Sequence, residues 1–429
     1  MINKIFYRRV KSIFSMLPSY TLYRIRVFVV DTLFYFFQRK INPETIKNHD
    51  TLLNWAKDNY RGKIHNEALS ENIDIINLKH KYLNYFQHKK LVFFIQLPAS
   101  AESPGNSSLF GNLIETIQYM GIQVFPFRKF KDLENLFAHQ VPNLILADDY
   151  TMYMKDWDWE KLRNLRKMHA FSIGLTATGS SNINTPLRVR LLLAKKSGVD
   201  FYYSFRKQAY LNYHEDYKLY HDFNYPIVSV PFGANILKFK PIKSNLEKDL
   251  DYIFIGSCNE AEYIKHFSDI FKNYYGFIGG PRWAHSEWID SRLHSWLYAR
   301  AKVGLNIHGP GGQKQWNFEV NERTYNLAAV GIPQIVDNPP FLHSIFGPDE
   351  IFVAGSPREY NSLFGYILKN PNIASDYANK AQKSVLLSHT TFHRIENFIN
   401  EISELLESSN VAFSSTPQKL DSELIKVRG

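Results

Sequence analysis

Residues 303–337 contain the pattern that most constrains the fold: an apolar run, a glycine-rich loop, a polar helix start and a second apolar run. Residues 303–307 are predicted to form a buried strand, and Gly331 marks the end of the helix that follows the loop. Gly309, Gly311 and Gly312 in the loop let backbone N–H groups approach an anion, and the helix start carries a partial positive charge. This unit therefore predicts a ligand edge at the carboxyl end of a strand.

Four polar residues near that helix start suggest which ligand it binds. Glu319, Glu322, Arg323 and Asn326 are spaced at three, four and seven residues, so one helical face can hold them all. Carboxylates and amides suit sugar hydroxyls and a guanidinium suits phosphate, so together they favour a sugar nucleotide. The alternative is that the loop and the helix face are ordinary packing features of an α/β protein.

Short apolar runs that predict buried parallel strands recur along the chain and alternate with helical segments. The runs are residues 91–98, 123–127, 143–149, 170–175, 199–204, 227–235, 251–257, 303–307, 332–337 and 350–354. A charged linker at 238–249 separates them into two groups. We therefore predict an α/β protein with two Rossmann-like domains facing across a cleft.

The predicted organisation has four parts. Residues 1–88 form a basic, amphipathic helical extension, residues 89–240 a Rossmann-like acceptor domain, and residues 250–385 a Rossmann-like nucleotide-sugar-binding domain. Residues 386–429 form a C-terminal helix and a mobile, polar tail.

The amino-acid composition indicates the cellular compartment and the charge of the binding partners. The single cysteine, Cys258, excludes an internal disulfide framework and a cysteine zinc cluster, which favours a reducing, cytoplasmic location. A net charge of +10 favours anionic partners without choosing among them.

Much of the excess positive charge lies in residues 1–40, where Asp31 is the only acidic residue. The apolar run at 27–37 is too short and too interrupted to span a membrane. This basic, aromatic segment is predicted either to lie on an anionic membrane, at the inner face of the plasma membrane, or to form a helix that docks on the main body.

Candidate acceptor and catalytic groups lie at predicted strand ends of the first domain. Asp148 and Asp149 end one strand, where a catalytic carboxylate would lie, although a helix N-cap is the other interpretation for each. Gly105 and Asn106 belong to a predicted loop, and Thr176 begins a hydroxyl-rich loop suited to a sugar or to capping.

The sequence gives no reason to expect a cofactor or a metal. No G-x-G-x-x-G fingerprint follows the first strand and no Walker A motif is present, so a bound dinucleotide is not predicted. Asp156 and Asp158 have the spacing of a metal-binding pair, but Trp157 and Trp159 around them favour the start of a helix. We predict no metal ion.

Three motifs carry a resemblance to a known family. They are Pro231-Phe232-Gly233-Ala234-Asn235, Asn306-Ile307-His308, and the run from Arg323 to Gly331 with Pro333 and Asp337. Together with the two predicted halves they resemble GT-B glycosyltransferases, most closely the CgeB-like, spore-maturation-protein-like branch of the group 1 enzymes. The resemblance covers about residues 90–400.

The resemblance implies transfer of a sugar from a nucleotide-diphosphate donor to an acceptor hydroxyl, without metal. Arg323 matches the family's arginine and is expected at the diphosphate, while Asn326 stands where the family has a ribose-binding glutamate. The expected donor-binding residues are Gly256, Asn306, His308, Gly309, Gly311, Gly312, Glu319, Glu322, Arg323 and Asn326. Asp148, Asp149 and His308 are the catalytic candidates, although His308 also fits a packed, structural histidine.

The predicted function is glycosyl transfer to a glycan, lipid-linked or protein acceptor in bacterial surface glycan synthesis. An inactive GT-B scaffold that binds a sugar or a partner protein is the alternative, because Asn326 replaces the glutamate. A nucleic-acid-binding role is not predicted, since the basic residues lie beside the apolar N-terminal run and no nucleic-acid motif is present.

Overall fold

The computed structural model describes residues 38–64, 72–97, 104–149, 157–177, 186–242, 246–257, 261–281, 283–308 and 320–408. The predictions for Gly309, Gly311, Gly312, Glu319, residues 1–37 and the C-terminal tail lie outside these residues.

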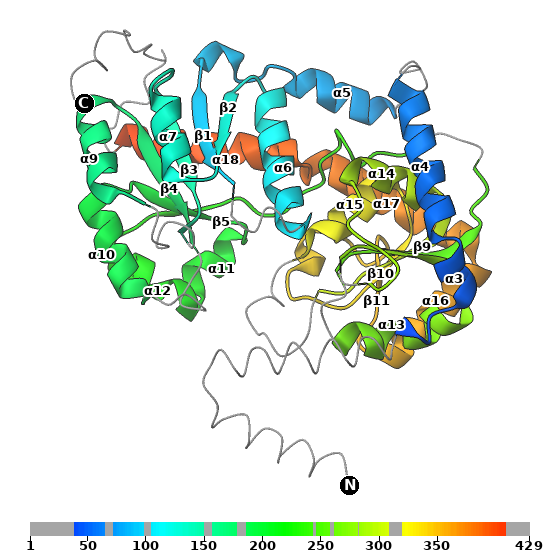
Figure 1. The fold of residues 1–429 in the computed structure, drawn as a ribbon. Helices are drawn as coiled ribbons and strands as arrows, with labels where there is room; N and C mark the ends of the chain where they lie inside the picture. The colour runs from blue at the N-terminus through cyan, green and yellow to red at the C-terminus, as the bar shows by residue number, and fades with distance from the viewer. Residues whose placement is uncertain are drawn as a thin grey trace.

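The first sheet has six parallel strands in the order β2-β1-β3-β4-β5-β6 (Figure 1). The strands are β1 (Val92–Gln96), β2 (Gln123–Phe127), β3 (Leu144–Ala147), β4 (Ser172–Thr176), β5 (Phe201–Ser204) and β6 (Ile227–Ser229). Each overlaps an apolar run that the sequence singles out, because strands covered on both faces have no polar side to alternate with.

Both faces of this sheet are buried. Along β1, Phe93 and Ile95 enter one apolar cluster while Val92 and Phe94 enter another. The helices of this domain are α6 (Pro104–Tyr119), α7 (Phe130–Phe137), α9 (Trp159–Met168), α10 (Leu187–Ser197), α11 (Gln208–Tyr213) and α12 (Glu215–Asp222). The N-cap of α9 is Asp158, whose side chain accepts the N–H groups of Glu160 and Lys161, so its predicted capping role is confirmed.

The start of α6 corrects one prediction. Gly105 and Asn106 lie in the first turn of this helix and not in a loop. Pro104 begins the helix, and proline suits that position because its fixed φ is helical and its missing N–H has no partner there in any case.

The second sheet has five parallel strands in the order β11-β10-β9-β7-β8. The strands are β7 (Leu250–Ile255), β8 (Gly276–Gly279), β9 (Ala301–Leu305), β10 (Gln334–Val336) and β11 (Phe352–Val353). Its helices are α13 (Ala261–Asn273), α14 (Ser291–Ala299), α15 (Glu322–Val330), α16 (Pro357–Lys369) and α17 (Pro371–Ser388). Gly331 ends α15 with a φ of 77°, which confirms the predicted glycine stop.

The N-terminal helices divide between the two domains and do not form one extension. α3 (Pro43–Lys47) packs on β8 and α4 (His49–Ile64) packs on α14, so both cover the second domain. α5 (Ile73–Tyr82) contributes Ile75 and Tyr82 to a core shared with the first sheet. Figure 1 shows α5 extending between α4 and the first domain.

The last helix returns to the first domain. α18 (Thr391–Ser408) packs against α6 and β6, and Figure 1 shows it behind the six-stranded sheet. Just before it, Ala234 pairs with Thr390 in a β-bridge, and the Thr391 N–H donates to the Ala234 carbonyl over 2.8 Å. The two segments that cross between the domains are thus bonded to each other.

Candidate functional site

The order of the second sheet identifies where a ligand would bind. The chain passes from β7 to β8 on one side and then to β9 on the other side of β7. At such a switch point the loops after the two central strands diverge and leave a crevice outside their carboxyl ends. The residues that follow β7 and β9 therefore form the first candidate site.

Arg323 lies at this switch point. Its Nε donates to the carbonyl of Ile255 at the end of β7 over 2.9 Å, and Nη1 donates to Oδ1 of Asn306, just after β9, over 3.2 Å. The guanidinium also lies over the Phe254 ring, 4.6 Å from its centroid. These contacts hold a positive charge across the carboxyl ends of both central strands.

Gly256 makes room for that guanidinium. A Cβ atom at Gly256 would lie 2.1 Å from Nη2 of Arg323, so a larger residue would displace the side chain. On the other side, a Cβ at Gly280, which has a φ of +125°, would lie 2.5 Å from the Gly256 carbonyl oxygen. Trp283 Nε1 donates to the same carbonyl over 2.8 Å, which fixes the turn after β7.

Uncharged side chains position Asn306 beneath Arg323. Asn321, the N-cap of α15, accepts from the Thr324 N–H and donates through Nδ2 to Oδ1 of Asn306 over 2.9 Å. Asn306 Nδ2 donates to Oγ1 of Thr324 over 2.8 Å. The Tyr360 hydroxyl accepts the Asn306 N–H over 3.0 Å, and burial raises the pKa of this hydroxyl well above its usual value.

His308 belongs to the same network and is buried, with 5% of its surface exposed. Its Nδ1 contacts Asp337 Oδ1, and its Nε2 lies 3.1 Å from Oγ1 of Thr324. Its backbone N–H donates to the same carboxylate over 2.9 Å. Both ring nitrogens therefore face protein groups, as in the predicted structural interpretation of His308.

Glu322 points towards the first domain and away from Arg323's contacts. Asn112 of α6 donates from Nδ2 to Glu322 Oε1, and Asn112 Oδ1 accepts from Asn235 Nδ2 over 3.1 Å and from Lys238 Nζ over 3.2 Å. Lys238 also pairs with Glu115 over 3.0 Å. Burial raises the pKa of the Glu322 carboxyl, against the lowering effect of Asn112 and Lys238.

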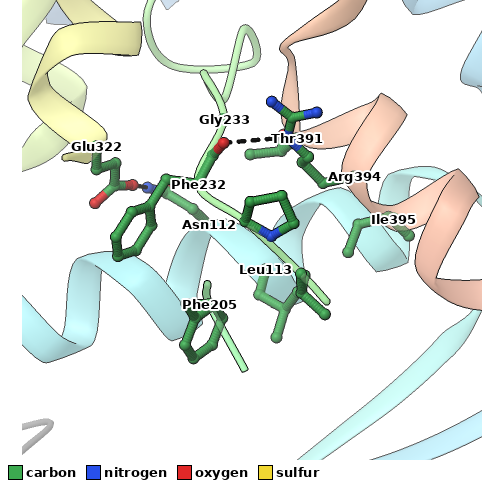
Figure 2. Close-up of a pocket in the computed structure, with 11 residues that line it drawn as sticks. Asn112, Leu113, Phe205, Phe232, Gly233, Glu322, Thr391, Arg394 and Ile395 are labelled. Carbon is green, nitrogen blue, oxygen red and sulfur yellow. Dashed lines mark hydrogen bonds between the residues drawn. The ribbon is translucent and has the colours of Figure 1, made fainter. Parts of the chain in front are cut away.

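A pocket opens beside this inter-domain cluster, with an empty volume of about 350 Å³. Figure 2 shows Glu322 and Asn112 on one side of it, Arg394 and Ile395 of α18 on the other, and Phe205 and Phe232 nearby. Arg394 donates from Nε to the Phe232 carbonyl over 3.1 Å. The pocket thus lies where the crossing segments meet both domains.

Asn326 lies one turn beyond Glu322 and is buried, and its Oδ1 has no hydrogen-bond partner in the described part of the chain. Glu322, Arg323 and Asn326 were predicted to share one ligand-binding face. The first two instead reach different groups, Glu322 the first domain and Arg323 the strand ends. These side chains therefore do not gather on one face, because α15 begins at the domain junction.

The first sheet has its own switch point, between β1 and β3. Gln96 ends β1, and its Oε1 accepts the Asp148 N–H over 3.1 Å. Thr176, at the end of β4, donates from Oγ1 to Asp148 Oδ1 over 2.8 Å. Asp148 is partly exposed, so this edge presents a carboxylate whose residue is held at its backbone by Gln96 and at its side chain by Thr176.

Asp149 is placed differently from Asp148, and it lies at neither a catalytic position nor a helix N-cap. Its side chain is fully buried and pairs with the guanidinium of Arg190 on α10, which is also buried. Its N–H donates to Oγ1 of Thr176 over 2.9 Å. The pair anchors α10 beneath the strand ends.

Several of these residues did not stand out in the sequence. Thr324, Tyr360, Arg190 and Gln96 acquire their roles from partners that are distant along the chain. Asn321 had a readable signal, because asparagine just before a helix is a favoured N-cap residue. Among the described residues, no group of three or more His, Cys, Asp or Glu side chains could hold a metal ion.

Two parallel, doubly wound sheets joined by a double crossing define a GT-B fold with two Rossmann-like domains. Residues 262–400, which include Asn306, His308 and Arg323, match the family described as glycosyl transferase-like. No curated protein matches the chain. The narrower CgeB-like assignment stays a prediction.

Solved structures share the fold at low identity. Sucrose-phosphate synthase from Thermosynechococcus elongatus is 14% identical with a TM-score of 0.50, over 75% of this chain and 100% of that one. HepE from Anabaena, in complex with UDP and glucose, is 11% identical with a TM-score of 0.49, over 74% and 100%. A glycosyltransferase from Rickettsia africae is 11% identical with a TM-score of 0.48, over 74% and 99%.

Proposed function

We propose that this chain is a glycosyltransferase that moves a sugar from a nucleotide-diphosphate donor to an acceptor hydroxyl. The observation that carries the proposal is the position of Arg323, whose guanidinium spans the switch point of the second sheet inside the glycosyl transferase-like region. A guanidinium at the carboxyl ends of central strands suits a diphosphate, which is the charged part of such a donor.

The chemistry needs negative charge to be stabilised as the nucleotide diphosphate leaves. Arg323 is held in place before the donor arrives, so it can stabilise that charge without reorganising. This arrangement requires no metal ion. His308, Thr324 and Asp337 act in the proposal as positioning residues, because each contacts Asn306 or another of the three.

Asp148 is the proposed acceptor-side group. It is a partly exposed carboxylate at the switch point of the first sheet, where a hydroxyl could be oriented or deprotonated. The proposed acceptor is a hydroxyl of a glycan, a lipid-linked sugar or a protein, in bacterial surface glycan synthesis. Thr176 holds Asp148 in position.

The proposed location is the cytoplasm, with residues 1–40 on the inner face of an anionic membrane. The support for this location is the basic, aromatic composition of that segment. No helix in the described residues is long and apolar enough to cross a membrane.

A donor-binding experiment tests the proposal. The chain is screened by thermal shift against UDP-, GDP- and dTDP-sugars, and hydrolysis of each stabilising donor is then measured. Arg323→Ala should weaken binding of the selected donor by about 10- to 100-fold, as expected for the loss of charge-assisted bonds. Arg358→Ala, which removes an exposed arginine on α16 of the same domain, is the matched control.

The outcomes separate the two candidate functions. Binding that depends on Arg323, with measurable hydrolysis, supports the transferase. Binding without hydrolysis of any donor supports an inactive sugar-binding scaffold, the alternative that Asn326 suggests. If Arg323→Ala and Arg358→Ala bind the donor equally, the proposed diphosphate site is wrong.

A further inference from the structure

Helix α10 has two apolar faces, and within the described residues one packs into the core while the other is exposed. Leu187, Leu191 and Ala194 pack into the core of the first domain, and Arg190 on the same side pairs with Asp149. The opposite side carries Val189 and Leu192, which are 43% and 54% exposed. A helix that keeps apolar side chains on its solvent side has surface to bury against something else.

The exposed apolar residues lie among cations. Arg188, Lys195 and Lys196 are exposed on α10, and their spacings of three, four and seven residues from Val189, Leu192 or one another place them on the same face. None of the three makes an ion pair with the described residues, and α10 contains no acidic residue. The face is thus basic and apolar together.

The neighbouring helix extends this surface. α9 packs against α10 and ends in Lys167 and Met168, both exposed, with Met168 exposed at 64%. Figure 1 shows α9 and α10 together on the outer side of the first domain, far from the five-stranded sheet. We call this surface, made of Lys167, Met168, Arg188, Val189, Leu192, Lys195 and Lys196, the α9–α10 face.

We infer that the α9–α10 face docks on the anionic surface of a lipid bilayer. Lysine and arginine side chains pair with phosphate headgroups while the leucine, valine and methionine side chains enter the boundary of the acyl region. Every charged side chain of this face is positive, so the charge of the face is complementary to that of an anionic lipid surface. This contact is separate from residues 1–40 and would set the first domain, which carries Asp148, against the membrane.

The test uses the full chain and two independent variants. One neutralises the cations (Arg188→Gln, Lys195→Gln, Lys196→Gln) and the other removes the apolar contacts (Val189→Ser, Leu192→Ser). Binding to vesicles of phosphatidylglycerol and phosphatidylcholine is measured by co-sedimentation. The vesicle partition coefficient should fall by about 10- to 100-fold for the first variant and about tenfold for the second. Vesicles of phosphatidylcholine alone should bind the wild-type chain far less.

A matched control lies on α17 of the second domain. Lys383→Gln with Leu387→Ser removes an exposed lysine and a leucine that is 74% exposed, more than Leu192. This control should leave vesicle binding unchanged. All changed side chains are exposed, so the melting temperature of each variant should stay within a few degrees of the wild type, which excludes unfolding as the cause.

Two results would overturn the inference. One is anionic vesicle binding that is the same for the wild type and both α10 variants. The other is no vesicle binding by the wild type together with binding to polyglutamate that depends on the α10 cations, which would assign the face to an acidic polypeptide. Neither result depends on donor binding at Arg323, so the proposed function is tested separately.

Discussion

The carboxyl edges of the two sheets use charge in opposite ways. At the first edge an arginine is buried, because Arg190 pairs with Asp149 inside the domain, and a carboxylate, Asp148, remains partly exposed. At the second edge the arginine is the group presented, because the partners of Arg323 among the described residues are a carbonyl, an amide and a ring. Within this part of the chain, no contacting carboxylate cancels the positive charge of Arg323.

This difference indicates which part of a substrate each sheet edge could bind. A guanidinium held by neutral partners keeps its attraction for phosphate. The charge of a guanidinium that is paired with a carboxylate is already neutralised by that partner. In the proposed function, the second edge accordingly binds the anionic donor and the first edge binds the neutral acceptor hydroxyl. Three changes break or sharpen this contrast.

The largest effect is expected from breaking the buried pair of the first edge. Asp149→Ala leaves Arg190 buried without its carboxylate, and removing one partner of such a pair costs about 3–5 kcal/mol of unfolding free energy. Urea unfolding followed by circular dichroism measures this loss. Asp148→Ala, one residue away and partly exposed, should cost far less; equal losses for the two variants would mean that the pair is not the structural anchor of this edge.

An intermediate effect is expected at the second edge from Gly256→Ala. The added methyl group would lie 2.1 Å from Nη2 of Arg323, so the guanidinium must leave the strand ends. Donor affinity should fall by about tenfold, in proportion to the lost charge-assisted bonds. Gly365→Ala on α16, where a Cβ meets nothing within 4 Å, is the control and should leave donor affinity unchanged. If the Gly256→Ala variant bound the donor as tightly as the wild type, donor binding would not depend on the present position of Arg323.

The smallest effect is expected at the junction between the edges. Because burial raises the pKa of Glu322, its protonated form favours the folded state: this contribution is present below its ordinary pKa of about 4.5 and is lost as pH rises through the raised value. Glu322→Gln should therefore melt a degree or two above the wild type near about pH 8, with the difference vanishing near about pH 4.

The exposed Glu160→Gln on α9 is the control for this pH dependence. Its melting temperature should follow the wild type across the same range. A Glu322→Gln variant that is less stable than the wild type at high pH would mean that the ionised carboxylate stabilises the junction through Asn112 and Lys238.

The strands were predictable because their signal is local. Each of the ten apolar runs overlaps a strand, since side chains buried on both faces make such a strand mainly apolar. β8 was not singled out, because glycine occupies both ends of its four residues. The glycine stop at Gly331 was readable for the same local reason.

The site was predictable only in part, because its partners are distant in sequence. Arg323 could be identified from its motif, but its contact with Ile255 spans 68 residues. Asp149 and Arg190 are 41 residues apart, so nothing near Asp149 distinguished a buried ion pair from a catalytic acid. Glu322 is adjacent to Arg323 in sequence, but its partner Asn112 on α6 is 210 residues away, so nothing local indicated that it faces the first domain.

The bonded crossing between the domains determines how they can move. With Ala234 tied to Thr390 and Arg394 holding the Phe232 carbonyl, the two connections form one short spine and do not act as independent tethers. Separation of the domains along a straight line would break this spine. Any relative motion of the domains therefore carries both connections together, at the edge of the pocket lined by Phe232, Gly233 and Arg394.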